Sequence, residues 1–421
     1  MPIGALPGFR DVFPDALARR RRIFAAWRDV AARYGFEEYD GPPLEPVDLY
    51  TKKSGDEIVD QLYRFTDKGD RDVALRPEMT PTLARMVAQR AAQLKKPIRW
   101  FSIPQLFRYE RQQRGRLREH FQLNMDIIGE AGALADAEVI AAAVDIVRTL
   151  GFGPGDVRVR LSDRRILADA LVRDVGLAAA DLPGVLSAID KIERNPEAVA
   201  TWIGERGLAA PVGESLTRFV GALEKPAALL EREAAKPLRE CLAALEAMGL
   251  APFVDVDFRI VRGLAYYTGI VFELFDAKRS LRAICGGGRY DDLLEQVGGV
   301  DLPCVGFGMG DVVLGELLSE RDGPPRAEPS VAVFVVAVGE EDRPAALGLA
   351  HQLRDRGLGV EFALKKQALG KQLELAVARG ARAAVVVGST ERESGQAVVR
   401  LLGPGTEQRV PFSQLVKDYA F

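Results

Sequence analysis

The sequence predicts an α+β fold for a body of about 320 residues, followed by a smaller α/β unit. Three patterns favour this class. Short runs of alternating apolar and polar residues indicate antiparallel strands in the body. A helically periodic stretch rich in Ala, Leu, Arg and Glu interrupts these strands at 165–250. Beyond a proline-rich segment at 322–330, sequence typical of buried strands alternates with sequence typical of helices. Because 421 residues exceed one ordinary core, we expect two domains, at 1–325 and 329–421.

The first expected element of the body is a helix at 16–34, which has one apolar face and ends at Gly35. An extended segment at 36–46 follows, in which two adjacent prolines argue against a central strand. Alternating sequence then predicts strands at 62–67, 72–78, 98–110 and 120–130. Helices are expected between these strands at 80–93 and after them at 133–151.

Beyond the helical insertion at 165–250, strand-like sequence returns at 254–288, and a helix follows at 291–297. The C-terminal unit alternates strand and helix, which implies a parallel or mixed sheet covered by helices. Its expected strands are 331–339, 360–364 and 381–388, with helices ending near 356 and 380.

Composition restricts the function classes. No run approaches the roughly 18 apolar residues of a membrane span, and the N-terminus lacks the basic and apolar regions of a secretory signal. Three scattered cysteines and two histidines do not have the spacing of a metal site, so we expect no protein-bound metal. Free thiols indicate a reducing compartment, and we therefore expect a cytoplasmic protein.

The net charge is only −3, so any attraction to nucleic acid must come from local basic patches. One patch is FRYERQQRGRLR at 107–118, which holds five arginines and a single acid. It is either a solvated hairpin with a charged tip or a phosphate clamp, since the planar fork of arginine suits phosphate oxygens. On a strand, Arg114, Arg116 and Arg118 would share one face, and Gly115 would permit a sharp turn.

Three further segments combine unusual residues. In ALRPEMTPTLAR, Thr80 is expected to cap a helix, whereas Glu78 is either a cation-binding acid or an exposed one. CGGGR allows close backbone approach, but it contains no dinucleotide or P-loop motif. In VRGLAYYTG, a strand would turn the two tyrosines to opposite faces, and Arg262, if buried, needs an anionic partner from the protein or from a substrate.

The order of these segments resembles that of a known family. FRYER and RGRLREHFQ resemble motif 2 of class II aminoacyl-tRNA synthetases, and YGFEEYDGPPLEP resembles their motif 1. LRPEMT, VRGLAYYTG and CGGGRYDDL are similar to signatures of histidyl-tRNA synthetases. Because five motifs match in order from about Gly8 to the end, the chain is identified as a member of that family.

The resemblance implies a class II catalytic domain, built on an antiparallel sheet with a helical insertion, and an α/β anticodon-binding domain at the C-terminus. It implies a ligase that activates histidine with ATP and Mg²⁺ to histidyl-adenylate, releasing diphosphate, and then transfers histidine to the 3′ end of tRNA(His). The implied partners are histidine, ATP and tRNA(His), with motif 1 at a homodimer interface.

The resemblance also implies residue roles. Arg108 and Arg262 would be the catalytic cations that flank the α-phosphate and the histidine carboxylate. Arg116, with Mg²⁺, would hold the triphosphate. The implied histidine-binding residues are Glu78, Thr80 and Gln122 at the ammonium group, Asp126 and Tyr267 at the imidazole, and Tyr290, which closes the pocket.

Three positions depart from the family pattern. Ala265 stands in place of an aspartate, and Asp126 in place of a glutamate, so this carboxylate is shorter by one methylene group. Val313, which follows the sequence GFGMGD, stands where class II enzymes place an arginine that contacts ATP. We expect coordinated substitution, with Arg289 as a candidate replacement at the triphosphate.

Two other functions fit parts of the sequence. A regulatory paralogue that assists ATP phosphoribosyltransferase shares the catalytic-domain fold, and the substitution at Val313 would suit it. The retained site arginines and the tail at 331–421 argue against this reading. A non-catalytic RNA-binding or tRNA-sensing module would not need an intact amino-acid pocket.

Overall fold

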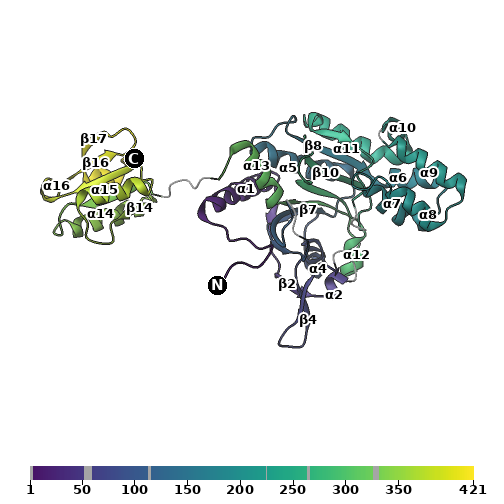
Figure 1. The fold of residues 1–421 in the computed structure, drawn as a ribbon, viewed down its shortest axis with the longest axis horizontal. Helices are drawn as coiled ribbons and strands as arrows, with labels where there is room; N and C mark the ends of the chain where they lie inside the picture. Colours follow the sequence, from purple (N-terminus) through teal and green to yellow (C-terminus); the bar gives the residue numbers. More distant parts are fainter. Residues whose placement is uncertain (1–2, 52–58, 112–114, 224, 263–265, 326–330) are drawn as a thin grey trace. The chain divides into compact units, whose positions relative to one another are not determined.

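The computed structural model describes residues 3–51, 59–111, 115–223, 225–262, 266–325 and 331–421. The chain divides into two compact units, Met1–Pro325 and Arg326–Phe421 (Figure 1). Within the described ranges, no helix is long and apolar enough to cross a membrane.

A nine-stranded sheet forms the centre of the first unit. Its strands are β1 (Glu37–Glu38), β5 (Ile98–Ser102), β6 (Gln105–Phe107), β7 (Glu119–Ile128), β8 (Val157–Asp163), β9 (Val254–Val256), β10 (Ile270–Asp276), β11 (Cys285–Arg289) and β12 (Cys304–Gly310). They lie in the order β1-β5-β7-β12-β11-β10-β8-β9, and β6 pairs with β7. The edge pairs β1–β5 and β8–β9 are parallel, and the pairs between them are antiparallel, which confirms the predicted class.

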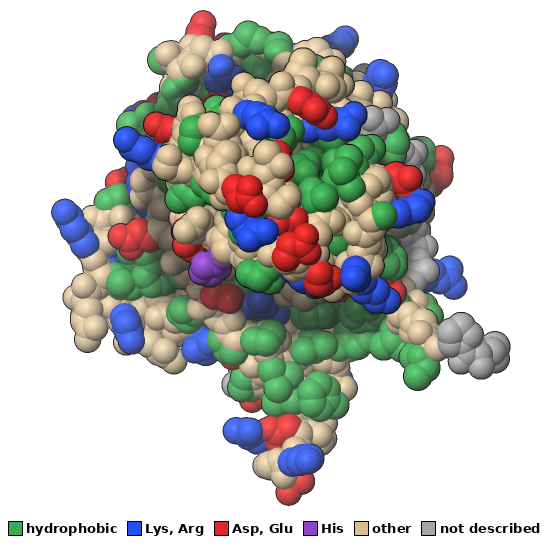
Figure 2. Space-filling view, turned by 90° about the vertical axis from the view of Figure 1, so that its left-hand side faces the viewer, with side chains coloured by type: hydrophobic (Ala, Val, Ile, Leu, Met, Phe, Trp, Pro, Cys, Tyr) green, Lys and Arg blue, Asp and Glu red, His purple; other side chains and the backbone are tan. Residues whose placement is uncertain are grey.

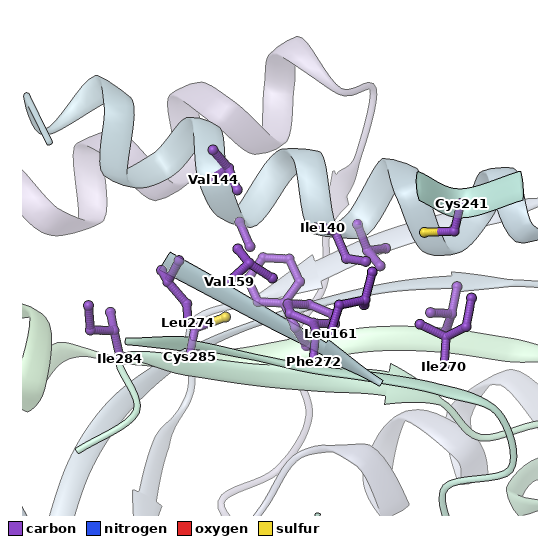
Figure 3. Close-up of a cluster of buried hydrophobic side chains, with 14 of the residues drawn as sticks. Ile140, Val144, Val159, Leu161, Cys241, Ile270, Phe272, Leu274, Ile284 and Cys285 are labelled. Carbon is purple, nitrogen blue, oxygen red and sulfur yellow. The ribbon is translucent and has the colours of Figure 1, made fainter. Parts of the chain in front are cut away.

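One helix supplies much of the core beneath this sheet. Helix α5 (Ala133–Thr149) is apolar on most of its surface and is buried along its length, as expected for a helix enclosed by other elements. Figure 3 shows its residues Ile140 and Val144 facing Val159 of β8 and Phe272 of β10. Helices α1 (Pro14–Arg33) and α11 (Lys236–Ala247) pack against α5.

The predicted insertion consists of helices joined by turns, with no strand among its described residues. Its helices are α6 (Arg164–Arg173), η1 (Ala179–Asp181), α7 (Leu182–Asp190), α8 (Ala198–Arg206), α9 (Ala210–Ala222), α10 (Ala227–Leu230), η2 (Glu233–Ala235), α11 and η3 (Ala251–Phe253). The remaining helices of the first unit are α2 (Asp48–Thr51), α4 (Thr80–Arg90), α12 (Leu293–Gly298) and α13 (Asp311–Asp322).

A small sheet of order β2-β4-β3 projects from the body. Its strands are β2 (Leu44–Pro46), β3 (Tyr63–Thr66) and β4 (Asp72–Leu75). The β3–β4 hairpin extends at the bottom of Figure 2, where its exposed tip, residues 67–71, carries both acidic and basic side chains.

Several expected strands are shorter in the structure than the sequence predicts, and the local chemistry explains two of them. The segment 98–110 forms two strands, β5 and β6, because the chain leaves the ladder at Ile103 and Pro104, and proline cannot donate a ladder hydrogen bond. The first strand-like run, VDVDFRIV at 254–261, keeps only β9, after which Asp257 and Arg259 form a local turn with a hydrogen bond from the Arg259 amide to the Asp257 carboxylate.

The second unit has a sheet of order β14-β13-β15-β16-β17 and a core of its own. Its elements are β13 (Val333–Ala337), α14 (Arg343–Asp355), β14 (Val360–Phe362), α15 (Leu369–Ala378), β15 (Ala383–Val387), α16 (Ser389–Ser394), β16 (Gln396–Leu401), β17 (Glu407–Pro411) and α17 (Phe412–Lys417). The first three strands in space are parallel and the last two are antiparallel, so the sheet is mixed, as expected.

Candidate active site

A cavity of about 660 Å³ lies in the first unit, against β7, β11 and β12. Its wall contains all but one of the ligand-binding residues that the sequence suggested. These are Glu78, Thr80, Arg108, Arg116, Gln122, Asp126, Arg262, Tyr267 and Tyr290. The exception is Arg289. Further arginines and acids complete a strongly charged wall, in which the arginines are the source of positive charge for an anionic ligand.

The floor of the cavity is built by alternation along β7. His120, Gln122, Asn124 and Asp126 all line the cavity, because residues two apart on a strand share a face. The neighbouring strand β12 contributes glycines opposite them, and a Cβ atom added at Gly306 or Gly308 would overlap the Asp126 carboxylate or the Gln122 amide, respectively. The glycines therefore make the room that these two polar side chains occupy.

Arg262 is held in a strained conformation beside the cavity. Its φ of 60° lies in the left-handed region, which is rare for a residue with a side chain and is often found at functional sites. Its Nη1 donates to Glu273 Oε1 at 3.2 Å, and its guanidinium lies 5.5 Å from the centre of the Tyr267 ring. Its buried Nε has no hydrogen-bond partner among the described residues. A Cβ atom at Gly286 would overlap this guanidinium, which explains the first glycine of the CGGGR segment.

Asp126 and Tyr290 form a buried polar pair. The Tyr290 hydroxyl donates to Asp126 Oδ1 at 2.5 Å, and both side chains are almost inaccessible to solvent. Burial raises the pKa of Asp126 to about 7, against the lowering effect of the Tyr290 hydrogen bond. Near neutral pH this carboxyl group can therefore accept a hydrogen bond as an anion or donate one as an acid.

The two tyrosines of the VRGLAYYTG segment differ from expectation. They do not lie on a strand, because β10 begins only at Ile270, and both line the cavity with ring centres 5.0 Å apart. The expectation that a strand turns them to opposite faces was therefore wrong, and both pack in one hydrophobic cluster. The left-handed turn at Arg262 had no clear indication in the sequence, since such a conformation normally calls for glycine or asparagine.

The role expected for Thr80 at the helix terminus also differs. Helix α4 begins at Thr80 itself, the N-cap position is Met79, and no side-chain capping hydrogen bond forms there. The Thr80 hydroxyl instead interacts with Tyr266 and faces the cavity. Glu78, in the preceding loop, is buried rather than exposed, which leaves the cation-binding alternative.

The arginine-rich segment is only partly directed into the cavity. Arg108 Nε donates to the carbonyl of Pro77 at 2.9 Å, which joins this segment to the loop that carries Glu78. Arg116 pairs with Glu110 in the cavity wall. Arg118 does not line the cavity, because it stacks at 3.9 Å on the Tyr109 ring. The expected shared face is thus wrong for Arg118, and Arg114 lies outside the described residues.

Arg289 is not in the cavity wall. It is 2% exposed, and its guanidinium contacts Asp136, Asp291 Oδ1 at 3.2 Å and the carbonyl of Glu130 at 3.1 Å. Burial raises the pKa of Asp136 to about 6, although the adjacent Arg289 lowers it. Because its donors are occupied by the protein, the geometry does not support Arg289 as a triphosphate contact.

Of the other two departures from the family pattern, Ala265 lies outside the described residues. Val313 is described: it is buried, it follows Asp311 at the start of α13, and its side chain lines the cavity. The Asp311 carboxylate accepts from the Phe121 amide at 2.9 Å, which fastens the start of α13 to β7. An apolar side chain therefore faces the cavity at the position where the class II family pattern has an arginine.

Several residues in the wall were not identified from the sequence. His120 and Asn124 could have been found, since the alternation that places Gln122 and Asp126 on one face places them there too. Arg194, on the turn after α7, and Arg282, between β10 and β11, had no motif to mark them. Their approach to the cavity depends on contacts between distant parts of the chain.

The architecture is that of a class II aminoacyl-tRNA synthetase. The crystal structure of histidyl-tRNA synthetase from Nostoc sp. PCC 7120 superimposes on this chain with a TM-score of 0.81 and 23% sequence identity, covering 99% of each chain. A likeness at that identity shows the fold.

Sequence similarity extends this to a family. The histidyl-tRNA synthetase family model matches residues 8–310, and an anticodon binding domain model matches 332–418. The histidine–tRNA ligase of Opitutus terrae is 46% identical and is aligned over 99% of this chain and 98% of its own length. The chloroplastic/mitochondrial histidine–tRNA ligase of Arabidopsis thaliana is 41% identical, over 97% of this chain and 85% of its own length. The chain belongs to the histidyl-tRNA synthetase family.

Proposed function

We propose that this protein activates histidine with ATP to histidyl-adenylate, releasing diphosphate, and transfers the histidyl group to the 3′ end of tRNA(His). The observation that carries the proposal is the position of Arg262. Its buried guanidinium keeps an unsatisfied Nε among the described residues, in a cavity that also contains the Asp126–Tyr290 pair. A buried donor without a protein partner is costly unless a ligand pairs with it.

The proposed chemistry needs fixed positive charge. When the histidine carboxylate attacks the α-phosphate of ATP, negative charge is spread over the phosphoryl oxygens. Arg108 and Arg262 are each held from behind by the protein, through the Pro77 carbonyl and the Glu273 carboxylate respectively. Such preorganised cations stabilise the transition state without reorganising during the reaction.

The same cavity offers groups that suit histidine. Asp126, oriented by the Tyr290 hydroxyl, and Tyr267 would contact the two imidazole nitrogens. The ammonium group would be received by Glu78, Thr80 and Gln122. A pocket built to pair both ring nitrogens rejects isosteres that lack them, because its own buried polar groups would then be left unpaired.

ATP would bind with its triphosphate toward Arg116, accompanied by Mg²⁺. Among the described residues, no group of three or more His, Cys, Asp or Glu side chains could hold a metal ion. The Mg²⁺ ligands would therefore come largely from phosphate oxygens and water, which is the usual arrangement for this ion in nucleotide sites.

The remaining partners are proposed on other grounds. The second unit matches an anticodon-binding domain, which supports its assignment to tRNA. The segment 36–46, which resembles motif 1, would contribute to a two-fold homodimer interface. The three cysteines are free and buried, which is consistent with a protein of the cytoplasm.

Histidine-dependent exchange of labelled diphosphate into ATP tests this function. We expect exchange by the intact protein and a loss of at least roughly 10²-fold in Arg262→Ala, because one preorganised donor to the developing charge is removed. Arg33→Ala, which removes an exposed arginine of α1 outside the cavity, should retain the activity.

Two outcomes would count against the proposal. Folded protein without any histidine-dependent exchange would favour the regulatory, non-catalytic reading. Near-normal exchange by Arg262→Ala would leave the activity in place but remove the role assigned to this arginine.

A further inference from the structure

The cavity lacks a cation at one position of its wall. The first turn of α13 has Val313 where class II enzymes place an arginine, and the replacement suggested by the sequence, Arg289, is engaged elsewhere. A triphosphate carries several negative charges in this region under the proposed function. The positive charge must therefore come from another part of the chain.

Arg282 lies beside the position of Val313. Both side chains lie next to Gly115 of the arginine-rich segment. A Cβ atom added at Gly115 would lie 3.3 Å from Val313 Cγ2 and 3.9 Å from Arg282 Cδ. All three residues line the cavity. The guanidinium attached to this Cδ atom can reach the space in front of Val313, since the terminal nitrogens of arginine lie three bonds beyond Cδ.

The turn that carries Arg282 is held in place. Asp276, the last residue of β10, accepts hydrogen bonds from the amides of Ser280 and Leu281 at 2.9 and 3.0 Å. The Ile284 amide donates to the Leu274 carbonyl at 2.7 Å, which closes the turn before β11. Arg282 is therefore presented by a hydrogen-bonded turn with a defined backbone.

The charges around Arg282 favour an anionic ligand. Arg116 and Arg194 share the cavity wall with it, and burial together with these two cations lowers the Arg282 pKa, while Glu110 opposes them. Glu110 already pairs with Arg116. Three neighbouring guanidinium groups in one wall repel each other, and a polyphosphate between them would relieve that repulsion.

This cation is distant from Asp126, at the end of the cavity proposed to bind the imidazole ring. Gly310, the last residue of β12, pairs with Gln122, whereas Gly306 pairs with Asp126. The four residue-to-residue steps from Gly306 to Gly310 along an extended strand span roughly 13 Å. Val313 follows Gly310 and so lies toward the end of β7 opposite to Asp126. A change at Arg282 should consequently affect ATP rather than histidine.

We propose that Arg282 binds the triphosphate of ATP and supplies, from the β10–β11 turn, the positive charge that is absent at Val313. This inference rests on the proposed function and identifies a further substrate-binding residue for it. The positive charge at the triphosphate would then come from the β10–β11 turn instead of from helix α13.

Diphosphate exchange with separate KM values for ATP and histidine tests the proposal. We expect Arg282→Ala to raise the KM for ATP by roughly 10- to 100-fold, as for loss of a charge-assisted hydrogen bond, and to leave the KM for histidine nearly unchanged. Lys278→Ala removes a positive charge from an exposed position of the same turn, and it should alter neither KM.

A double variant separates electrostatics from packing. Arg282→Ala combined with Val313→Arg returns an arginine to the helix, and it should recover much of the lost ATP affinity. If Arg282→Ala is poorly folded, Arg282→Gln, which keeps most of the side-chain length, gives the same comparison. Thermal unfolding of each variant checks that the fold is intact.

The proposal is overturned if the ATP KM of folded Arg282→Ala or Arg282→Gln matches that of the unaltered protein. It is also overturned if both KM values rise together, since that would indicate a purely structural role. Absence of exchange by the unaltered protein would instead count against the proposed function. Calorimetric titration with ATP alone would then still decide whether Arg282 binds the nucleotide.

Discussion

Asp126 shows how a single residue is tuned by its surroundings. Its carboxylate is one methylene group shorter than the glutamate of the family pattern, and Tyr290 reaches it across the cavity at 2.5 Å. The sequence identified both residues as candidates, but the pKa of about 7 depends on complete burial between strands. That burial follows from the pairing of β7 with β12, which local sequence does not specify.

The pKa of Asp126 leads to a prediction about stability. Its ordinary pKa is 3.8 and its folded pKa is about 7, so the unfolded chain loses this proton first as pH rises. The stability of the folded protein then falls between these two values and stays low above the higher one. Asp126→Asn removes this penalty, so its stabilising effect on the ligand-free protein should be larger at pH 8 than at pH 5, by about 2–3 kcal/mol.

Denaturant unfolding at the two pH values measures this difference. All three tryptophans, Trp27, Trp100 and Trp202, lie in the first unit, so their fluorescence follows the unit that contains Asp126. The exposed Asp29→Asn serves as a control and should behave alike at both pH values. An effect of Asp126→Asn that is independent of pH would contradict the raised pKa.

At the scale of elements, two glycine-containing strands shape the cavity. Gly286 of β11 leaves space for the Arg262 guanidinium, and Gly306 and Gly308 of β12 leave space for side chains of β7. Gly287 and Gly288 instead lie against the backbone of the adjacent strands. The sequence indicated close approach at CGGGR, but only the strand register shows which glycine faces the cavity and which face a neighbouring strand.

Gly286→Ala is expected to impair the site without unfolding the protein. The added methyl group would collide with the Arg262 guanidinium, whose side chain must move out of its position beside Glu273. We expect a loss of diphosphate exchange close to that of Arg262→Ala, with destabilisation of about 1–3 kcal/mol. Exchange kinetics and thermal unfolding measure the two effects.

Gly315→Ala, on α13, is the matched control for this variant. Its added methyl group would meet only Ile23 Cδ1, at 3.9 Å, and alanine is favoured over glycine within a helix. This control should keep its activity. Full activity of Gly286→Ala would show that Arg262 works equally well from a different position.

At the scale of the whole molecule, the chain consists of two units with separate cores. The first unit contains the cavity, and the second has an apolar core formed by both faces of its mixed sheet. Each unit therefore has the internal contacts that independent folding requires. We propose that the domain boundary lies at the segment 326–330, between the unit that activates histidine and the unit that binds tRNA.

Truncation after Pro325 tests this division of roles. The fragment 1–325 should retain histidine-dependent diphosphate exchange, because the described cavity wall lies within it. Its transfer of histidine to tRNA should fall by roughly 10²-fold or more, since the linked second unit would no longer raise the local concentration of tRNA. Filter-binding assays of charged tRNA measure the transfer.

The two activities of the fragment need a common control. Circular dichroism should confirm that the fragment is folded before either assay. Equal loss of exchange and transfer in a folded fragment would contradict the proposed division. Undiminished transfer would show that the second unit is not needed for tRNA.

The sequence by itself determined the fold class, the helical insertion, the family and most of the cavity residues. These features are encoded locally, in the spacing of apolar residues and in short motifs such as LRPEMT and CGGGRYDDL. The shared face of Gln122 and Asp126 on β7 is encoded locally for the same reason, because it needs only the two-residue period of a strand.

The tertiary structure alone decided which charged groups are available to a ligand. Arg289 is paired outside the cavity wall with Asp136, which is 153 residues away in sequence. Arg282 lines the cavity from a turn that has no recognisable motif. Arg262 takes a left-handed conformation that no local preference explains. The physical reason is common to all three: whether a cation is satisfied, buried or exposed to a ligand depends on long-range packing and not on its neighbours in sequence.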